Sequence, residues 1–209
     1  ENLDFYKKMH IDGYDLVTGK KRNPKNAYDG KSTLIYAKLI KNIILKNKIE
    51  SMLDYGCGKG HYYESATKEY GIPNKSLRDF WEIDIDLYDP CFEKNSYINE
   101  NKKYDLIICI DVLEHIPSID IDWVLKKIIN KSNKYVFLNI ACYPAVALLP
   151  NGKNAHININ SPEWWHKKIL NLKKNNKLLK IICICTVKDN GIVKYFPLQY
   201  DDKLINYNT

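Results

Sequence analysis

Carboxylates and imidazoles in the middle of this sequence have the types and spacing that chemistry at a substrate requires. Asp111, Glu114 and His115 are spaced i, i+3 and i+4, so they share one face wherever the chain turns helically. Carboxylate and imidazole together can hold Mg²⁺, Mn²⁺ or Zn²⁺, and such an ion lowers the pKa of a bound hydroxyl. Without an ion, His115 or His156 could act as a general base toward an oxygen or nitrogen nucleophile.

A glycine-rich string forms a second candidate site, suited to binding a ligand. Residues 54–60 read Asp-Tyr-Gly-Cys-Gly-Lys-Gly and follow a short apolar run. Glycines at such a strand-to-helix turn let the backbone adopt positive φ and approach a ligand closely. A dinucleotide fingerprint, G-x-G-x-x-G, would need glycine where the chain has His61. The string therefore predicts a ligand-binding turn of another type, at the first crossover of a sheet.

Asp89 is the acid best placed to complete that site. It follows the segment 81–88, in which apolar and acidic residues alternate, and it precedes Pro90, which stops the predicted strand. Ligands of open α/β sheets bind at the carboxyl ends of the strands, where an acid can accept hydrogen bonds from ribose hydroxyls. Asp84 and Asp86 are rivals, but both lie in mid-strand.

The order of the predicted elements provides the scaffold for these residues. We expect strands over 52–54, 81–88, 104–110, 135–141, 179–186 and 192–197. Helices are expected from a Ser32 cap to residue 44, over 62–70 and 121–129, and from the pair Ser161-Pro162 to residue 174. Asn190-Gly191 predicts a hairpin turn between the last two strands. Alternating strands and helices predict a doubly wound α/β sheet with an antiparallel edge.

Three strings together give the chain a family resemblance. They are the glycine string, the segment Leu87–Pro90, and residues 104–117, which read Tyr-Asp-Leu-Ile-Ile-Cys-Ile-Asp-Val-Leu-Glu-His-Ile-Pro. The chain resembles class I S-adenosylmethionine (SAM) dependent methyltransferases, including uncharacterised bacterial and phage members. The resemblance implies a Rossmann-like, doubly wound seven-stranded sheet, mostly parallel with an antiparallel C-terminal edge strand and an N-terminal helical lid. It implies a single domain over residues 1–209, with the lid or extension at 1–50 and the catalytic core at 51–209.

The resemblance also implies an activity and a cofactor site. The reaction would be transfer of the SAM methyl group to an oxygen or nitrogen nucleophile, which we expect to belong to a small molecule. Asp111, His115 and His156 are the expected catalytic residues. The residues expected to bind SAM are Lys31, Asp54, Tyr55, Gly56, Cys57, Gly58, Gly60, Tyr88, Asp89, Asp111 and Val112.

A divalent metal is implied by two narrower resemblances. Ubiquinone-pathway O-methyltransferases carry E-x-x-E-H, and small-RNA 3′-terminal 2′-O-methyltransferases carry it with a later histidine before a serine- or threonine-led helix. The resemblance to these groups implies a metal held by Asp111, Glu114, His115 and His156. Asp111 stands where those enzymes have the first glutamate, and its side chain is one methylene shorter. An RNA 2′-O-methyltransferase is therefore one alternative function. A SAM-binding or SAM-consuming protein that transfers no methyl group is another.

Composition limits the possible partners of this 209-residue chain. Its net charge of +7 comes from 30 lysines and only two arginines, Arg22 and Arg78. Specific readers of nucleic acid favour arginine, whose planar group pairs with phosphate and guanine, so a nucleic-acid partner is possible but not favoured. No apolar run approaches the roughly 20 residues that span a bilayer, so we expect no membrane partner. Six cysteines without a C-x-x-C pair predict a reducing, cytoplasmic location, and the oligomeric state stays open.

Overall fold

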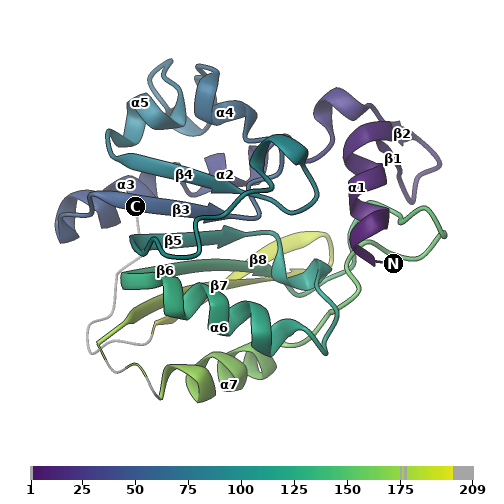
Figure 1. Ribbon diagram of the computed structural model, residues 1–209. Helices are drawn as coiled ribbons and strands as arrows, with labels where there is room; N and C mark the ends of the chain where they lie inside the picture. The colour runs from purple at the N-terminus through teal and green to yellow at the C-terminus, as the bar shows by residue number, and fades with distance from the viewer. Residues whose placement is uncertain (1, 175, 177, 200–209) are drawn as a thin grey trace.

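A six-stranded sheet forms the centre of the computed structural model, which describes residues 2–174, 176 and 178–199 (Figure 1). The strands lie in the order β4-β3-β5-β6-β7-β8. Their bounds are Ser51–Tyr55 (β3), Asp84–Tyr88 (β4), Tyr104–Ile110 (β5), Ser132–Ala141 (β6), Lys180–Asp189 (β7) and Ile192–Gln199 (β8). All neighbouring pairs are parallel except β7 and β8. The predicted mostly parallel sheet with an antiparallel C-terminal edge is thereby confirmed.

The sheet has six strands in the described residues, where the resemblance implied seven. β4 forms one edge, because among the described residues only β3 pairs with it. After Asp89 the chain folds back and makes one 3₁₀ turn, η3 (Glu93–Asn95), before β5 begins. That fold-back is held by the Asp89 backbone N–H, which donates to the Asn95 carbonyl at 2.8 Å. Two short strands, β1 (Tyr14–Asp15) and β2 (Lys21–Arg22), pair with each other apart from the main sheet.

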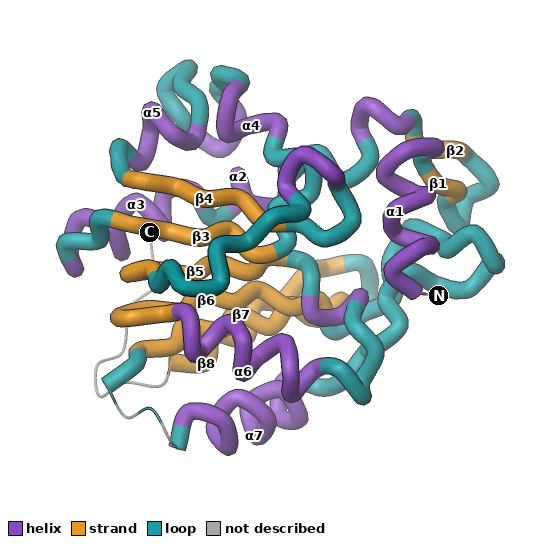
Figure 2. Tube along the Cα trace, in the orientation of Figure 1, coloured by secondary structure: helices purple, strands orange, loops and turns teal. Residues whose placement is uncertain are grey.

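Helices cover both faces of the sheet (Figure 2). On one face, α3 (Ala37–Asn47) and α5 (Leu77–Trp81) pack against residues such as Ile108 and Phe137. On the other, α6 (Ile121–Lys131) and α7 (Pro162–Lys173) pack against Ile107 and Leu138. Strands buried on both faces are almost continuously apolar, as residues 106–110 are, which is why the 104–110 run was readable as a strand. None of the helices in the described part of the chain is long and apolar enough to cross a membrane.

The predicted helix after Ser32 differs from the observed one. The chain forms α2 (Lys31–Ile35), breaks at Tyr36, and continues as α3. Gly30, with φ of 88°, precedes the first turn, so the cap position belongs to glycine and the Ser32 prediction was wrong. The Ser32 hydroxyl instead donates to Asp111 Oδ2 at 3.0 Å, across the carboxyl ends of the strands.

Two further boundaries in the 61–88 region were wrong. The predicted helix over 62–70 is a single turn, α4 (His61–Glu64), because Ser65 turns extended and Thr67 bridges to Lys75. The strand predicted from residue 81 starts at Asp84, since Trp81 ends α5. Both segments mix apolar and polar residues over fewer than ten positions, where helical and strand periods are hard to separate.

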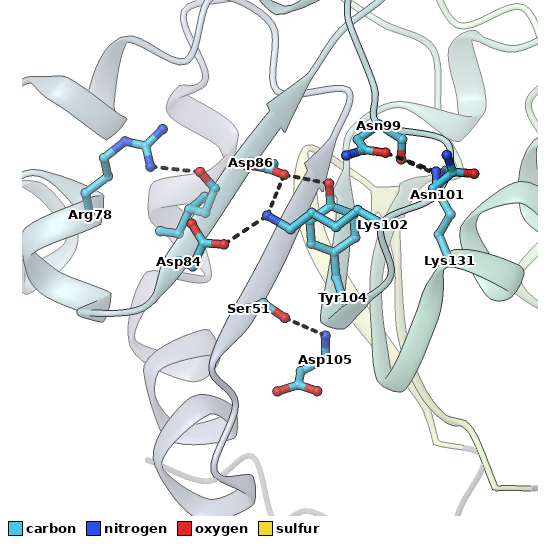
Figure 3. A network of polar contacts seen from close by, with 11 residues as sticks. Ser51, Arg78, Asp84, Asp86, Asn99, Asn101, Lys102, Tyr104, Asp105 and Lys131 are labelled. Atoms are coloured by element: carbon cyan, nitrogen blue, oxygen red, sulfur yellow. Dashed lines mark hydrogen bonds and ion pairs between the residues drawn. The ribbon is translucent and has the colours of Figure 1, made fainter.

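Polar contacts near the amino end of β4 use the acids that rivalled Asp89 (Figure 3). Lys102 Nζ lies 2.9 Å from both Asp84 Oδ2 and Asp86 Oδ2. The Tyr104 hydroxyl donates to Asp86 Oδ2 at 2.6 Å. Both carboxylates therefore help to anchor β4 to the start of β5, and Asp89 is the β4 acid at the carboxyl end.

Helix α1 (Asn2–Asp12) stands beyond the carboxyl ends of the strands, in the position expected of a lid (Figure 1). Its buried side chains Tyr6 and Met9 belong to a small apolar cluster with Ala147, Leu149 and Ala155. The Tyr6 hydroxyl also donates to the Ala155 carbonyl at 2.7 Å. The helix is thereby fixed to the loop that follows β6.

Candidate functional site

A cavity of about 820 Å³ opens where β3, β4 and β5 end. Sites for small molecules usually measure about 300–1,000 Å³. Its lining comes from five stretches of the chain, within residues 2–10, 28–33, 55–58, 88–91 and 110–124. The three strings singled out in the sequence all contribute, because the carboxyl ends of parallel strands meet at one edge of the sheet.

The glycine loop forms the floor of this cavity and has no room for larger residues. Gly56 and Cys57 donate their backbone N–H groups to the Tyr88 carbonyl at 2.7 and 3.2 Å. Gly58 has φ of 58°, and a Cβ there would lie 2.3 Å from the Tyr28 carbonyl oxygen. Gly56 has φ of 90°, and a Cβ there would lie 2.4 Å from Val112. Glycine is thus required at both positions by conformation and by contact.

Asp89 lies at the carboxyl end of β4 and lines the cavity beside this loop. Its Oδ2 accepts the Gly58 N–H and its Oδ1 accepts the Cys91 N–H, both at 2.8 Å. An ionised carboxylate has about four lone-pair positions, so two remain for a ligand. Asp89 thus lies at the carboxyl end of its strand as expected, and its binding of a ligand stays a prediction.

Asp111, His115 and His156 lie close together, and the first two line the cavity. One possible ligand atom from each lies within 4.8 Å of the others. The rings of His115 and His156 meet edge to face with centroids 4.7 Å apart. Asp111 has φ of 60°, an uncommon conformation for a residue with a side chain that is often found at functional sites.

Both histidines use the same nitrogen to bond a backbone carbonyl. His115 Nδ1 lies 2.9 Å from the Ala155 carbonyl, and His156 Nδ1 lies 2.6 Å from the Tyr143 carbonyl. A carbonyl only accepts, so each Nδ1 carries a proton, and Nε2 is the nitrogen left for an ion or a substrate. Burial, followed by the neighbouring His156, lowers the pKa of His115 to about 4, so its imidazole is neutral at pH 7. Neutral imidazoles with a fixed Nδ1–H are the form that binds metals or accepts protons.

Glu114 does not join this cluster. Its side chain is fully buried, and its Oε1 accepts the backbone N–H of Ala141 at 2.6 Å. Burial first, and the charge of Asp111 second, raise the pKa of Glu114 well above its usual range. A neutral carboxyl at this position avoids repulsion with Asp111 and holds the start of the loop after β6. The structure therefore brings together three of the four residues expected to bind a metal.

Other expected residues lie around the cavity without lining it. Lys31 forms an exposed ion pair with Glu69 at 2.7 Å, and Gly60 lies behind the loop, near Leu87 and Asn95. Asp54 is buried beneath the loop, where its Oδ2 accepts the Tyr63 hydroxyl at 2.7 Å. Of the expected cofactor residues, the cavity is lined by Tyr55, Gly56, Cys57, Gly58, Tyr88, Asp89, Asp111 and Val112.

Asp54 should make the stability of the protein depend on pH. Burial raises its pKa to about 7, above the value of about 3.9 in an unfolded chain. The folded state therefore holds the Asp54 proton more tightly than the unfolded chain does. The resulting contribution to stability is fully present below about pH 4 and is lost as the pH rises toward 7. We expect the free energy of unfolding to fall by up to about 4 kcal/mol more in the wild type than in Asp54→Asn over this window. Urea denaturation at several pH values measures it, and parallel curves for the two proteins would contradict it.

Several cavity residues could not be found from the sequence. Tyr6 and His10 come from α1, Tyr28 precedes the first core helix, and Ser32 was assigned to a cap. Each meets the site through contacts with residues far along the chain, such as the bond between Ser32 and Asp111. No local pattern marks such contacts.

Comparison with known protein families agrees with the geometry of this cavity. A family model described as a methyltransferase domain matches residues 23–173. The chain belongs to this family of methyltransferase domains. The matched segment contains the glycine loop, Asp89 and the Asp111–His115–His156 cluster of the methyltransferase, while α1 lies outside it. No curated protein matches the chain.

Glu114 should support the fold of this methyltransferase rather than its chemistry. Glu114→Ala leaves the Ala141 N–H without an acceptor and opens a buried hole, so we expect a loss of about 2–4 kcal/mol in the free energy of unfolding. Glu114→Gln keeps an acceptor oxygen and should lose about 1 kcal/mol or less. Urea denaturation compares the two, with the exposed Glu93→Ala as a control. Equal losses in both Glu114 variants would show that the hydrogen bond is unimportant.

Proposed function

We propose that this methyltransferase binds SAM in the 820 Å³ cavity and methylates a hydroxyl of a small molecule with the help of a divalent metal. The observation that carries the proposal is the continuity of the cavity. It runs from the glycine loop and Asp89 to Asp111 and His115. A nucleoside bound at the glycine loop would therefore adjoin a group that accepts protons or binds a metal, as methyl transfer requires.

The residues around the glycine loop fit SAM. Asp89 keeps lone pairs for ribose hydroxyls, and the loop exposes backbone where a side chain would block approach. Tyr55, Tyr88 and Val112 offer apolar surface for an adenine ring. Bound SAM supplies a methyl group made electrophilic by its sulfonium charge. The protein would contribute position and alignment, which account for much of the rate of such transfers.

Asp111, His115 and His156 fit a divalent metal. One carboxylate and two imidazoles suit Zn²⁺ or Mn²⁺, and they leave coordination positions open for an acceptor. A divalent ion there would lower the pKa of the acceptor hydroxyl. Ser32 bonds to Asp111, and two backbone carbonyls fix the rings, so the ligands are oriented by their surroundings. Should the acceptor be methylated without an ion, His115 Nε2 or His156 Nε2 would take its proton.

The acceptor has its own approach to this cluster. His156 lines a second cavity of about 510 Å³, together with Asn2, Phe5, Asn151 and Lys153. Asp111 and His115 line the first cavity, so the cluster lies between the two. Donor and acceptor would therefore meet from different sides, which suits in-line transfer. The volume of the second cavity favours a small molecule, and its mixed lining, with Phe5, Leu149 and Ile157 beside polar residues, favours one that has both apolar and polar groups.

Two alternatives are distinguished by binding and transfer. The metal cluster would serve a ribose hydroxyl equally well, so an RNA 2′-O-methyltransferase predicts a salt-sensitive shift of RNA in a gel. Absence of RNA binding at low salt would end that alternative. A protein that binds SAM without transferring its methyl group predicts tight SAM binding and no methylated product with any acceptor.

A radiometric assay tests the proposed function. The purified protein is incubated with SAM labelled in the methyl group, a panel of small hydroxylated and amino compounds that includes vicinal diols, and Mg²⁺, Mn²⁺, Co²⁺ or Zn²⁺. We expect label in a hydroxylated product, and a rate that falls about 10²-fold or more when a chelator is added. Label in an amine at a rate that the chelator leaves unchanged would contradict the proposal.

A further inference from the structure

Helix α1 places a buried imidazole in the cofactor cavity, although the helix lies outside the matched family segment. We propose that His10 is a cofactor contact, whose Nε2 accepts a hydrogen bond from a ribose hydroxyl of the bound nucleoside. This inference rests on the proposed binding of SAM and names a contact that the three sequence strings do not contain. The cavity is lined by Asn2, Leu3 and Tyr6 from the same helix.

The hydrogen bonds of His10 define which nitrogen faces a ligand. Nδ1 lies 2.8 Å from the Tyr6 carbonyl, one turn earlier in α1, so Nδ1 carries the proton. Nε2 is therefore an acceptor, and it has no hydrogen-bond partner among the described residues. The side chain is only 5% exposed. Buried polar atoms are nearly always paired, so an unpaired acceptor on a residue that lines the cavity points to a donor supplied by a ligand.

The ring of His10 is held rigidly against the part of the chain that supports the glycine loop. It stacks on Tyr28 with centroids 4.4 Å apart and planes 16° apart. Phe92 lies nearly parallel, with its centroid 6.2 Å away. The Tyr28 carbonyl accepts the N–H of Lys59, within the loop, at 2.7 Å. His10 is thus fixed relative to the nucleoside site before a ligand arrives, which favours binding.

The position of His10 indicates which donor it meets. The centroid of the Phe92 ring lies 6.2 Å from that of His10, and the Phe92 backbone N–H donates to the Asp89 carbonyl at 3.2 Å. His10 and Asp89 therefore lie near each other in the lining of the cavity, and both can act as acceptors. A ribose offers two adjacent hydroxyl donors, which matches two neighbouring acceptors. The adenine amino group and the ammonium of the methionine moiety each lack this vicinal arrangement.

Titration of S-adenosylhomocysteine tests the role of His10. His10→Phe keeps an aromatic ring on Tyr28 but removes the acceptor, and we expect binding about 5- to 10-fold weaker. His10→Gln returns an acceptor near the position of Nε2 and should recover most of that loss. Ile11→Ala, on an exposed position of the same helix, should bind as the wild type does. Thermal unfolding of each variant checks that α1 remains folded.

Deoxy analogues of S-adenosylhomocysteine identify the partner. If His10 accepts a hydrogen bond from one ribose hydroxyl, the analogue that lacks this hydroxyl, either 2′-deoxy or 3′-deoxy, should bind the wild type more weakly than S-adenosylhomocysteine does. His10→Phe should bind that analogue no more weakly than the wild type does. Equal affinity of His10→Phe and wild type for S-adenosylhomocysteine would overturn the inference. The inference would also be overturned if the losses in affinity caused by His10→Phe and by removal of a hydroxyl were additive for both analogues. It would be overturned as well if His10→Gln bound S-adenosylhomocysteine no more tightly than His10→Phe does. In each of these cases the wild type still binds, whereas a wild type that binds neither SAM nor its product would overturn the proposed function.

Discussion

Replacement of His156 by alanine is expected to abolish divalent-metal binding and to slow methyl transfer by about 10²–10⁴-fold. The reason is geometric, because His156 offers one of three possible ligand atoms that lie within 4.8 Å of one another, and its ring is oriented by the bond between Nδ1 and the Tyr143 carbonyl. Two remaining ligands would leave an ion only weakly held. The visible absorption of bound Co²⁺ measures metal binding, and SAM labelled in the methyl group measures the rate of methyl transfer.

Two further variants separate the loss of a ligand from a change in folding. Asp111→Asn keeps the shape of the side chain and the acceptor for the Ser32 hydroxyl but removes the negative charge. Like His156→Ala, it should therefore lose both metal binding and methyl transfer. His61→Ala removes an exposed imidazole at the start of α4 and should leave both unchanged. A His156→Ala protein with wild-type metal affinity and wild-type rate would show that the cluster is structural.

Substitution of Gly58 by alanine is expected to weaken SAM binding by about 10²-fold. An alanine Cβ would lie 2.3 Å from the Tyr28 carbonyl oxygen, which is backbone and cannot turn aside. The loop would have to move, and the hydrogen bond from the Gly58 N–H to Asp89 would be lost with it. Tenfold in affinity corresponds to about 1.4 kcal/mol, so the expected loss equals roughly 3 kcal/mol.

Gly19→Ala is the matched control for this substitution. Gly19 has φ of 77°, in the same left-handed region, but a Cβ there would meet nothing within 4 Å. It should therefore show the conformational penalty of alanine, about 1–2 kcal/mol of stability, without any effect on SAM binding. Calorimetric titration of both variants measures the difference. Equal affinities would indicate that the loop does not approach the cofactor.

The parts of the fold that the sequence predicted are those fixed by local patterns. β5 matches its predicted range, because a central parallel strand is almost continuously apolar, as residues 106–110 are. The hairpin of β7 and β8 turns at Asn190 and Gly191, both with positive φ, as that dipeptide indicates. The cap of α7 is also as expected, since Ser161 Oγ accepts the Trp164 N–H at 3.3 Å.

The parts that the sequence did not predict depend on contacts between distant residues. His10 reaches the cavity because Tyr6 and Met9 pack against residues near position 150, and no local pattern records that packing. Glu114 occupies the spacing of a metal ligand, yet its carboxyl turns inward to the Ala141 N–H. Spacing could place Asp111, Glu114 and His115 on one turn, but it could not say which side chains face the cavity.

Calorimetric titration of SAM into the wild type and Asp89→Ala tests the central claim most directly. Asp89 joins the glycine loop to the cavity and keeps lone pairs for the ligand, so its loss removes charge-assisted hydrogen bonds. The wild type should bind SAM in the micromolar range, and Asp89→Ala should bind about 10- to 100-fold more weakly. A wild-type protein that shows no heat of binding with SAM, under conditions where it is folded, would contradict the account.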